Sequence, residues 1–498
     1  MPRAECELYP DFQAEIEEID KNGISDGLLN HIINKHTANA EHNRKLHKRY
    51  EVLDGEVPIF LREPHFEEEN PVNNKVNNDF VGEIVDFKTG YFAGKPAVYN
   101  YADTEESKED TGGEAARDEA AKALSDFVVR NNMPDKDLDA TKFAALAGYA
   151  GRQFYFDKDG HERCIVIPSY ETIVLSETDI TEPKYGIRYY KTKGLGGEDV
   201  WKAEFDDGKM IRFYEGHLGG MYEVKEKAMP NLFGLCAIQG IPNNSEMLGD
   251  AEKVMELIDA YDRTTSDVNN EIESFANAYM AFENVDMDDQ EIQKGQKSGA
   301  FQYFTSGTQP GSIHFITKNI NDAFVEHHLD RLEENIYRFS KTPNLTSDQN
   351  FGNASGESLK FKLTGLETKC SMFQQKMNSA AVYMFKLLAS SWAKKRIAID
   401  PLQCYITFKR NFPVNVMSEA QAVSALIAAG LPKRKAFEML SWVDDVDEIM
   451  DLIEEEKEEI ASLYPNLSSI NTTDDDDDDG EDGNKPDGVG ADRTEVDE

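Results

Sequence analysis

An apolar side chain recurs in alternating steps of four and three through residues 246–282, and this is the clearest pattern in the chain. Its members are Met247, Ala251, Val254, Ile258, Tyr261, Thr265, Val268, Ile272, Phe275, Tyr279 and Phe282. The spacing predicts one narrow apolar seam on a single helix, about 55 Å long at the usual rise per residue. The remaining faces of that helix are mostly acidic. Such a seam indicates packing in a core or between subunits, and not a cofactor site.

Two further helices follow, and a polar segment separates them. The first is predicted over 320–340, with apolar positions at Ile320, Phe324, Leu332, Ile336 and Phe339. The second is predicted over 357–397, with a seam at Leu359, Leu363, Leu366, Cys370, Phe373, Met377, Ala380, Met384 and Leu387. Its polar positions are basic, at Lys360, Lys362, Lys369, Lys376, Lys386, Lys394, Lys395 and Arg396. The segment between them, 342–356, is rich in Gly, Asn and Ser and holds no basic residue.

The N-terminal half combines helices with a β-rich stretch. Residues 1–24 are acidic and show no pattern, and helices are predicted over 25–50, 75–92, 115–132 and 136–150, with a mobile linker at 103–114. From residue 152 the apolar period changes to two. Asp159-Gly160 and Asp207-Gly208 lie between strand-like runs, which is a strong hairpin signal. We therefore expect a β meander over 152–228, joined to Pro242 by a link of small residues, and an α+β fold.

The segment 283–318 loses the helical period. It holds glycines at Gly295, Gly299, Gly307 and Gly311 and strand-like runs at 300–304 and 312–317. Another strand-like run, 404–415, precedes a compact helical module over 417–464, whose first helix is expected to begin at the capping box Ser418-x-x-Gln421. The tail that follows contains DDDDDDGEDG and has too little apolar surface to fold.

Charge and composition restrict the kind of partner and compartment. The chain has 94 acidic residues against 53 basic ones, a formal net charge of −41. Affinity for DNA comes mainly from Lys and Arg, so this balance alone favours an acidic interaction protein or a solvated assembly. The five cysteines are scattered and are expected to be reduced and structural: Cys6, Cys164, Cys236, Cys370 and Cys404. We expect no secretory signal, and the most apolar stretch, 380–393, is broken by Lys386 and too short to span a membrane.

Motifs for catalysis, nucleotides or metals fail on their spacing. GYFAGKP (90–96) resembles a Walker loop, but Pro96 stands where a magnesium-binding Ser or Thr is needed. His328 falls in the apolar phase of the 320–340 helix, which favours a core histidine over a ligand. The acidic run 475–480 imitates a calcium loop, but Pro486 replaces the closing Glu. We therefore expect no enzyme, no cofactor and no metal site.

Several blocks of the sequence resemble a known family. They are RYEVLDGEVPIFLRE (49–63), NNKVNNDFVGEIVDFKTGYFAGKPAVY (73–99), the helix with Tyr261-Asp262, FGNASGESLKFKLTGLETK (351–369) and FKRNFPVNVMSEAQAV (408–423). In order and spacing over residues 25–465 they resemble portal proteins, the head-tail connectors of long-tailed bacteriophages, of the kind typical of Gram-positive hosts. The acidic tail is not part of that resemblance.

The resemblance implies a helix-rich α+β portal fold assembled as a ring, usually of twelve subunits, at one capsid vertex. The implied parts are an N-terminal acidic segment 1–24, a wing 25–245, a first stem helix 246–282, a clip 283–318, a second stem helix 319–341, a tunnel loop 342–356, a long channel or wing helix 357–399, a wing strand 400–416, a helical crown 417–465 and a disordered acidic tail 466–498. The implied partners are further copies of the chain, the terminase packaging motor, a head-completion adaptor, and the major capsid and scaffolding proteins, with no membrane. The implied location is the virion, with assembly in the host cytoplasm.

The resemblance also implies a role for the polar segment 342–356 as the wall of a DNA conduit. Each phosphate that a protein neutralises adds a salt-dependent grip, so short polar side chains would centre passing double-stranded DNA with weak and non-specific contact. The implied channel residues are Asn344, Thr346, Ser347, Asp348, Gln349, Asn350, Gly352, Asn353 and Ser355. The basic positions Lys360, Lys362, Lys369 and Lys376 either pair with acidic helices of neighbouring subunits or line the bore. Two other functions stay open, an acidic capsid-assembly or scaffolding protein without DNA contact and a nuclease that uses scattered carboxylates.

Overall fold

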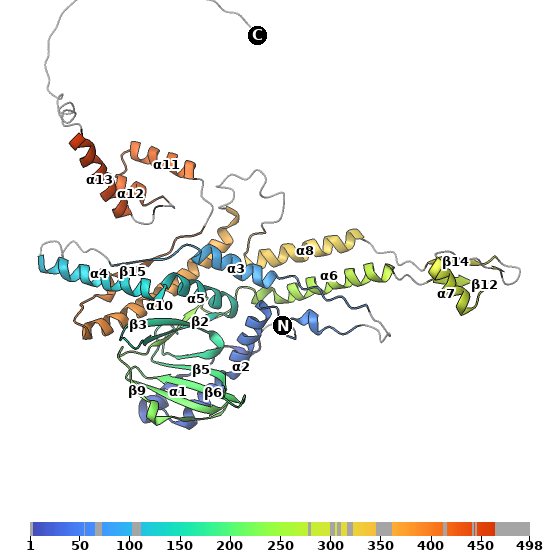
Figure 1. Cartoon of the computed structure of the whole chain (residues 1–498), viewed down its shortest axis with the longest axis horizontal. Helices are drawn as coiled ribbons and strands as arrows, with labels where there is room; N and C mark the ends of the chain where they lie inside the picture. The colour runs from blue at the N-terminus through green and yellow to red at the C-terminus, as the bar shows by residue number, and fades with distance from the viewer. Residues whose placement is uncertain are drawn as a thin grey trace, which may run out of the picture. The chain divides into compact units, whose positions relative to one another are not determined.

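The computed structural model describes most of the chain and divides it into two compact units. The described residues are 3–53, 55–64, 72–101, 111–276, 280–298, 304–305, 310–315, 322–344, 361–411, 416–440, 443 and 446–463. One unit covers Met1–Pro413 and the other Val414–Glu498 (Figure 1). The fold mixes helices and sheets, so the predicted α+β class is confirmed.

The helices of the first unit are bounded as follows. They are η1 (Glu5–Glu7), α1 (Gln13–Asn22), α2 (Asp26–Tyr50), η2 (Pro58–Leu61), α3 (Phe80–Ala93), α4 (Thr111–Asn131), α5 (Met133–Ala147), η4 (Ser169–Glu171), η5 (Lys225–Lys227), η6 (Glu252–Val254), α6 (Met255–Ala276), α7 (Asp289–Ser298), α8 (Asp322–Ser340), α10 (Thr364–Lys394) and η7 (Pro401–Gln403). The prediction of a linker over 103–114 is wrong at its C-terminal end, because α4 already begins at Thr111. Residues 102–110 lie outside the described part.

The strands of the first unit form one larger sheet, one three-stranded sheet and three two-stranded pairs. The larger sheet holds β4 (Thr172–Leu175), β5 (Tyr185–Lys193), β6 (Asp199–Asp206), β7 (Met210–His217), β8 (Gly220–Glu223) and β9 (Met229–Pro230). The three-stranded sheet holds β10 (Ile238–Pro242), β2 (Tyr149–Phe156) and β3 (Glu162–Pro168). The pairs are β1 (Val98–Tyr101) with β15 (Cys404–Thr407), β11 (Met280–Glu283) with β14 (Ser312–Phe315), and β12 (Val285–Asp286) with β13 (Phe304–Thr305).

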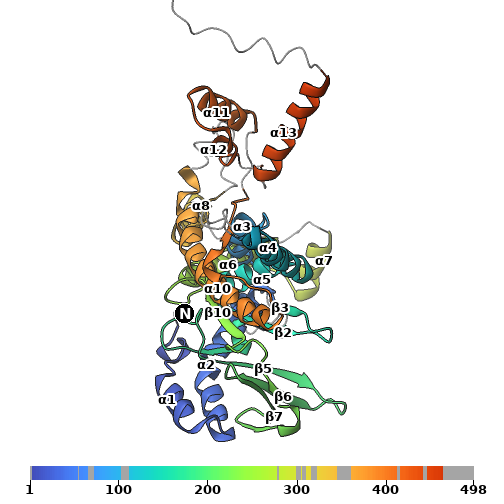
Figure 2. The same ribbon diagram turned by 90° about the vertical axis from the view of Figure 1, so that its left-hand side faces the viewer.

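The first two helices of the chain pack against the larger sheet (Figure 2). Its strands follow the order β4-β5-β6-β7-β8, with β9 paired to β7, and all pairs are antiparallel. Phe12, Ile16 and Ile19 are buried and share one core with Phe205 of β6. The prediction that residues 1–24 lack a pattern is therefore wrong, because their apolar residues recur at helical spacing and cover the sheet.

Both predicted Asp-Gly turns are present, but the expected single meander is divided between two sheets. Gly160 and Gly208 have positive φ angles of 78°, which the turns require. The turn at Gly160 joins β2 to β3, and the turn at Gly208 joins β6 to β7 in the larger sheet. The predicted link of small residues before Pro242 is instead the strand β10, which pairs with β2 and is fully buried.

α10 is a long, largely buried helix that contributes to two of the cores of the first unit. It contacts α3, β10 and β15, and its N-terminal half shares a core with Phe92 and Ile241. The predicted seam is confirmed for the residues described, since Leu363, Leu366, Cys370, Phe373, Met377, Ala380, Met384 and Leu387 are all buried. Leu359 lies outside the described residues. The β1–β15 pair brings residues 404–407 back to the N-terminal half of the chain.

α6 and α8 lie side by side, and α6 is shorter than the sequence pattern suggests (Figure 1). α6 ends at Ala276, which gives a helix of about 33 Å. The prediction of one helix over 246–282 is wrong at both ends: Met247 has a positive φ of 52°, and Met280 begins strand β11. Phe80 of α3 packs against both helices. The centroid of its ring lies 5.0 Å from that of Tyr261 on α6 and 5.8 Å from that of Tyr337 on α8.

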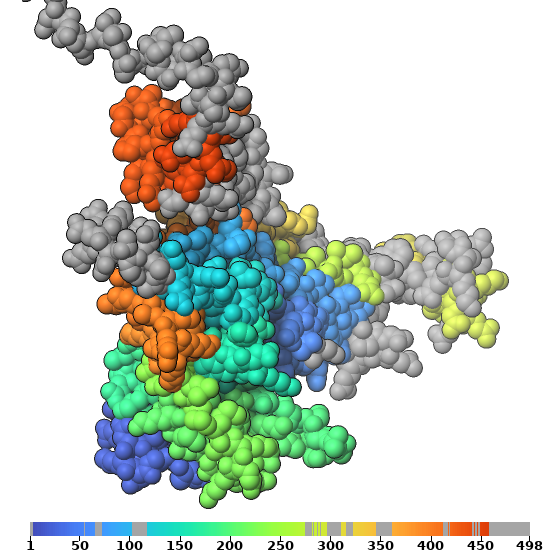
Figure 3. Space-filling view, turned by 60° about the vertical axis from the view of Figure 1, so that its left-hand side comes forward, coloured from blue at the N-terminus to red at the C-terminus, as the bar shows by residue number. Residues whose placement is uncertain are grey.

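An extended segment before α3 runs along α6, and Figure 3 shows the blue surface of this part of the chain against the yellow-green surface of α6. The backbone N–H groups of Asn74, Val76 and Asn78 donate to the side chains of Asn270 (2.6 Å), Ser266 (2.9 Å) and Asp262 (2.9 Å). Two extended residues advance by about as much as four helical residues, so every second N–H meets the next turn of α6. The helix predicted over 75–92 therefore has the wrong start. It is α3, which begins at Phe80 after its cap Asp79.

Two expectations for residues 283–340 also fail. The segment 283–318 contains the helix α7, although its sequence shows no long apolar period. On α8, Leu332 and Ile336 are buried as predicted, but Phe324 and Phe339 are 69% and 55% exposed. The imidazole of His328 stacks on Phe324 at the surface, with ring centroids 6.5 Å apart, so the prediction of a core histidine is wrong for this single chain.

The second unit is a small helical module. Its helices are α11 (Val416–Ala428), α12 (Lys433–Phe437) and α13 (Val446–Leu463), and its core contains Val423, Ala436 and Leu440. Gly430 has a positive φ of 95° between α11 and α12, as its place after the first helix suggested. The predicted capping box is wrong, because α11 already begins at Val416. Residues 464–498, with the poly-Asp run, lie outside the described part.

Candidate functional site

The two ends of the segment 345–360 are held close together. The Lys369 amine of α10 donates a 2.8 Å hydrogen bond to the Ser340 carbonyl at the end of α8. Gly365 faces Lys341 so closely that a side chain on Gly365 would touch it at 3.5 Å. Residues that enter and leave the segment are thereby fixed against each other, although its own residues lie outside the described part.

α8 ends in a compact backbone turn that directs the chain toward this contact. Lys341 has a left-handed φ of 59°, and the Thr342 N–H donates to the Tyr337 carbonyl at 3.1 Å. This is the bond pattern of a Schellman cap, in which glycine usually takes the left-handed position. A lysine there places a long cationic side chain where the helix ends.

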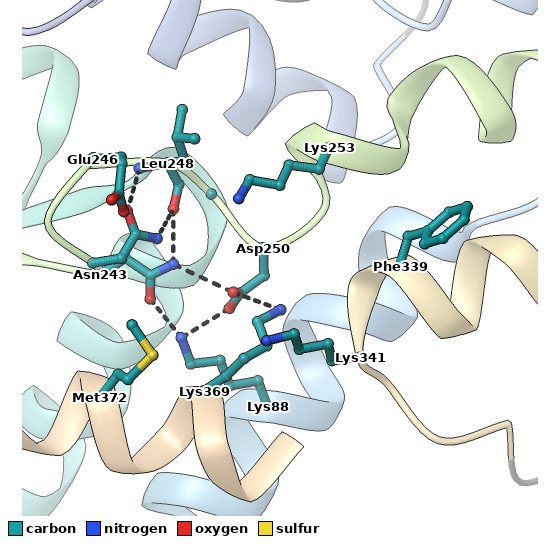
Figure 4. Close-up of a pocket in the computed structure, with 12 residues that line it drawn as sticks. Lys88, Asn243, Glu246, Leu248, Asp250, Lys253, Phe339, Lys341, Lys369 and Met372 are labelled. Atoms are coloured by element: carbon teal, nitrogen blue, oxygen red, sulfur yellow. Dashed lines mark hydrogen bonds and ion pairs between the residues drawn. The ribbon is translucent and has the colours of Figure 1, made fainter. Parts of the chain in front are cut away.

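A buried cluster of opposite charges lies directly behind this turn (Figure 4). The Asp250 carboxylate lies 2.8 Å from the Lys88 amine of α3 and 2.8 Å from the Lys369 amine of α10. The side chains of Lys88 and Asp250 are only 2% and 3% exposed, and Asn243 accepts a further hydrogen bond from Lys88. We call Lys88, Asn243, Asp250 and Lys369 the hub. It joins three separate stretches of chain to the base of the 345–360 segment.

Burial and opposite charge act against each other in the hub. Burial alone would raise the pKa of Asp250, but the two ammonium groups of Lys88 and Lys369 hold it below its ordinary value. Burial lowers the pKa of Lys369, and Asp250 opposes that shift. The cluster therefore depends on all three charges being present together, because each one compensates for the desolvation of the others.

Residues 243–250 connect the hub to the C-terminal end of α5 through direct backbone contacts. The Asp250 N–H donates to the Ala145 carbonyl at 2.7 Å, and the Asn243 N–H donates to the Gly148 carbonyl at 2.8 Å. A side chain on Gly148 would lie 1.9 Å from the Met247 carbonyl oxygen, and one on Gly249 would lie 2.3 Å from that of Leu146. Both glycines allow an approach of backbone to backbone that no other residue permits.

The described residues offer little for catalysis. They contain no group of three or more His, Cys, Asp or Glu side chains arranged to hold a metal ion. Cys164, Cys236, Cys370 and Cys404 are free and buried, and burial raises the pKa of the Cys370 thiol to about 11. None of the helices in the described part is long and apolar enough to cross a membrane.

Comparison with known proteins decides the family. The sequence model of a family described as phage portal protein, SPP1 Gp6-like, matches residues 29–463. The chain belongs to this family. The portal protein of Bacillus phage SPP1 is 23% identical over 423 residues, which are 80% of this chain and 79% of that protein. The portal protein of Clostridium phage phiCD119 is also 23% identical over 423 residues, 79% of this chain and 88% of the other.

The family match confirms the resemblance seen in the sequence and sets the class of function. A phage portal protein is a structural component of the virion, and this family is not an enzyme family. The hub lies within the matched residues, which run from Leu29 in α2 to Leu463 at the end of α13.

Most of the channel residues expected for a portal protein fall in the segment the structure does not describe. Thr346, Ser347, Asp348, Gln349, Asn350, Gly352, Asn353 and Ser355 lie outside the described residues, as does Lys360. Asn344 is described, is half-buried and donates its amide to Glu333 of α8 at 2.7 Å. The channel role of these residues stays a prediction.

The basic residues of α10 have partners that the sequence did not suggest. Lys369 pairs with Asp250, and Lys376 pairs with Asp179 at 2.9 Å. Further along the helix, Lys386 and Lys395 also bind carboxylates of the same chain. Lys362 is half-buried just before α10. Neither alternative for this basic face, the bore or a neighbouring subunit, foresaw ion pairs within one chain at Lys369 and Lys376.

Sequence reasoning missed Lys88, Asn243 and Asp250 as site residues. One signal was available, because Lys88 stands in the largely apolar helix FVGEIVDFKTGYFA, where a buried charge needs a partner. The sequence does not identify that partner.

Proposed function

We propose that copies of this chain close into a ring of twelve subunits at one capsid vertex, and that double-stranded DNA passes through its pore during packaging and ejection. The family match over residues 29–463 supports this proposal. The observation that carries it is the hub, whose Lys369 joins the described residues on the two sides of the segment 345–360 at one buried point. A conduit needs such a firm base if a short polar loop is to guide DNA without binding it tightly.

The parts of the chain take the following roles in this proposal. α6 and α8 are the stem, 283–318 is the clip that meets the packaging motor and later the head-completion adaptor, and 342–356 is the tunnel loop. Residues 25–245 with the strand region 400–416 form the wing, 357–399 form the long helix beside the channel, and 417–465 form the crown. Capsid and scaffolding proteins surround the ring, which assembles in the host cytoplasm and remains in the virion.

The tunnel loop is tested by adding phosphate-binding charge to it. The variant D348K/Q349K gives each loop two new cations, which should grip DNA and slow or stall packaging while rings still assemble. A matched control, D159K/E226K, changes the charge by a similar amount at two exposed sites in the sheet region. The measurements are nuclease-protected DNA per head and ring assembly by electron microscopy. Normal genome filling in D348K/Q349K would contradict the proposal that residues 342–356 are the loop that guides DNA.

The net charge of −41 favours a second candidate function, an acidic capsid-assembly protein that never contacts DNA. Electron micrographs of the purified full chain separate the two. Rings with an axial hole support the portal role, whereas filaments or stable monomers support the second candidate. Incubation with DNA and magnesium tests the nuclease alternative, for which we expect no cleavage.

A further inference from the structure

A cavity of about 140 Å³ opens beside the hub, and its lining carries more positive than negative charge. Four lysines from four separate stretches line it, Lys88, Lys253, Lys341 and Lys369, against the two carboxylates of Glu246 and Asp250 (Figure 4). We call this cavity the lysine pocket. Cations gathered around a cavity repel one another, so the arrangement is most stable when an anion enters.

Two of the four lysines are uncompensated. Lys88 and Lys369 share Asp250, as described above. The amines of Lys253 and Lys341 form no ion pair or hydrogen bond with any residue in the described part of the chain, and both side chains are exposed. The open side of the lysine pocket therefore presents two free ammonium groups, held at the start of η6 and the end of α8.

The rim of the lysine pocket is apolar. Phe339 of α8 and Met372 of α10 line the cavity and are 55% and 53% exposed. Large apolar side chains beside free charges are typical of a protein interface, where the apolar groups supply contact area and the charges set the register. A DNA backbone would use the cations but would leave Phe339 and Met372 exposed to water.

The same chain carries a complementary acidic surface. Glu326, Asp330 and Glu334 follow one another at four-residue spacing on α8, are exposed, and form no ion pair within the part of the chain that the structure describes. With 94 acidic residues against 53 basic ones, a surface of another copy is far more often acidic than basic. Contacts in which such carboxylates meet cations avoid the repulsion between the acidic surfaces of neighbouring copies.

We propose that the lysine pocket is a contact between neighbouring copies of this chain, in which Lys253 and Lys341 receive the carboxylates of Glu326, Asp330 and Glu334 from the next copy. This inference rests on the proposed ring and deepens it by naming the two surfaces that join. Each copy presents the pocket to one neighbour and the acidic face of α8 to the other, which is a head-to-tail contact that closes into a ring.

The test is a charge swap in the full chain. K253E/K341E places like charges against the neighbour's carboxylates and should raise the concentration needed for half-maximal ring formation by about tenfold or more. E326K/D330K/E334K should have the same effect. Both sets combined in one chain should restore ring formation, because the contact is then complementary again with its charges reversed. The matched control K209E/K225E reverses two exposed lysines of the sheet region.

Ring formation is measured by analytical ultracentrifugation, with thermal unfolding as a check that each variant folds. If the wild-type chain forms no rings, the proposed function itself fails. If wild-type rings form and K253E/K341E forms them equally well, only this inference is overturned. It is also overturned if K253E/K341E assembles normally but its rings lose affinity for a short DNA duplex, since the occupant would then be phosphate. Loss of assembly in both charge variants, with recovery in the combined chain, supports it.

Discussion

The Asp250 carboxylate lies 2.8 Å from the Lys369 amine, and the same amine donates to the Ser340 carbonyl at 2.8 Å. One ammonium group thus ties the start of α6 and the end of α8 to α10. Because Ser340 and Lys369 flank the segment 345–360, this side chain joins the described residues on its two sides. The four predictions below test how much the protein depends on the hub and on the contacts around it.

Removing the Lys369 amine should loosen the described residues on the two sides of the segment 345–360. In K369M the Ser340 carbonyl and Asp250 lose a donor, so we expect a stability loss of about 2 kcal/mol, rings that still form, and slower packaging. The matched control is K376M, seven residues later on α10, whose ion pair with Asp179 lies nearer the surface. Packaging is measured as nuclease-protected DNA per head. Equal packaging defects in K369M and K376M would show that the defect does not come from losing the contacts of Lys369 with Ser340 and Asp250.

Neutralising Asp250 should be more damaging than neutralising Asp179. D250N leaves Lys88 and Lys369 close together without a counter-charge in a buried site, which is expected to cost about 3–5 kcal/mol. Asp179 is 37% exposed, so D179N should change the free energy of unfolding by no more than about 1 kcal/mol. Denaturant titration of the full-length variants measures both. Similar losses in the two variants would mean that the hub contributes no more than a surface ion pair.

Two buried histidines should make the first unit sensitive to mild acid. Burial lowers the pKa of His36 to about 3, and burial together with Lys142 lowers the pKa of His47 to about 4. Each is neutral in the folded chain but binds a proton near pH 6.5 when unfolded. The stability they contribute is therefore complete above pH 6.5 and declines as the pH falls toward 4, by about 1.4 kcal/mol per pH unit for each histidine.

His47 offers a clean test of this pH dependence. Its Nε2 has no hydrogen-bond partner, and its ring packs edge-on against Phe143 and Tyr170, so H47F should fit the site. At pH 5 we expect H47F to recover about 2 kcal/mol of the loss seen in the wild type. The control H161F replaces a histidine whose side chain is exposed. The thermal unfolding midpoints of the wild type and of H47F are measured at pH 7 and at pH 5. If H47F loses as much stability between these two pH values as the wild type, His47 is not a source of the acid sensitivity.

The backbone contact at Gly148 should tolerate no side chain. G148A would place a methyl group 1.9 Å from the Met247 carbonyl at a φ of 89°, so we expect a loss of more than about 2 kcal/mol. G160A is the matched control, because Gly160 has a similar φ of 78° but nothing within 4 Å of the added methyl group. It should lose only about 1 kcal/mol from backbone strain. Equal losses in the two variants would show that strain alone matters and that the contact does not.

Periodic patterns predicted the buried faces where one helix supplies the whole pattern. The seam on α10 is buried at every described position, because a helix that crosses a core must place apolar residues at three- and four-residue steps. The Asp-Gly turns were equally reliable, since the left-handed glycine and the alternation on either side are local properties. The motif blocks predicted the family, which the match over residues 29–463 confirms.

The same pattern failed where a distant partner competes for the chain. The apolar series continues to Phe282, yet Met280–Glu283 form β11 because β14 supplies backbone hydrogen bonds there. On α8, Phe324 and Phe339 fit the predicted seam but are exposed, because one chain alone does not cover that face. Period alone could not show which partner each apolar residue would meet.

The sequence by itself determined the family, the α+β class, the hairpin turns and the apolar face of α10, because each follows from neighbours within a few residues or from whole motif blocks. Only the tertiary structure decided that Lys88, Asp250 and Lys369 meet, that Lys376 pairs with Asp179, and that Lys253 and Lys341 find no carboxylate among the described residues. An ion pair forms between whichever charges the fold brings within a few ångströms, and the identity of that partner is not encoded in the spacing around either residue.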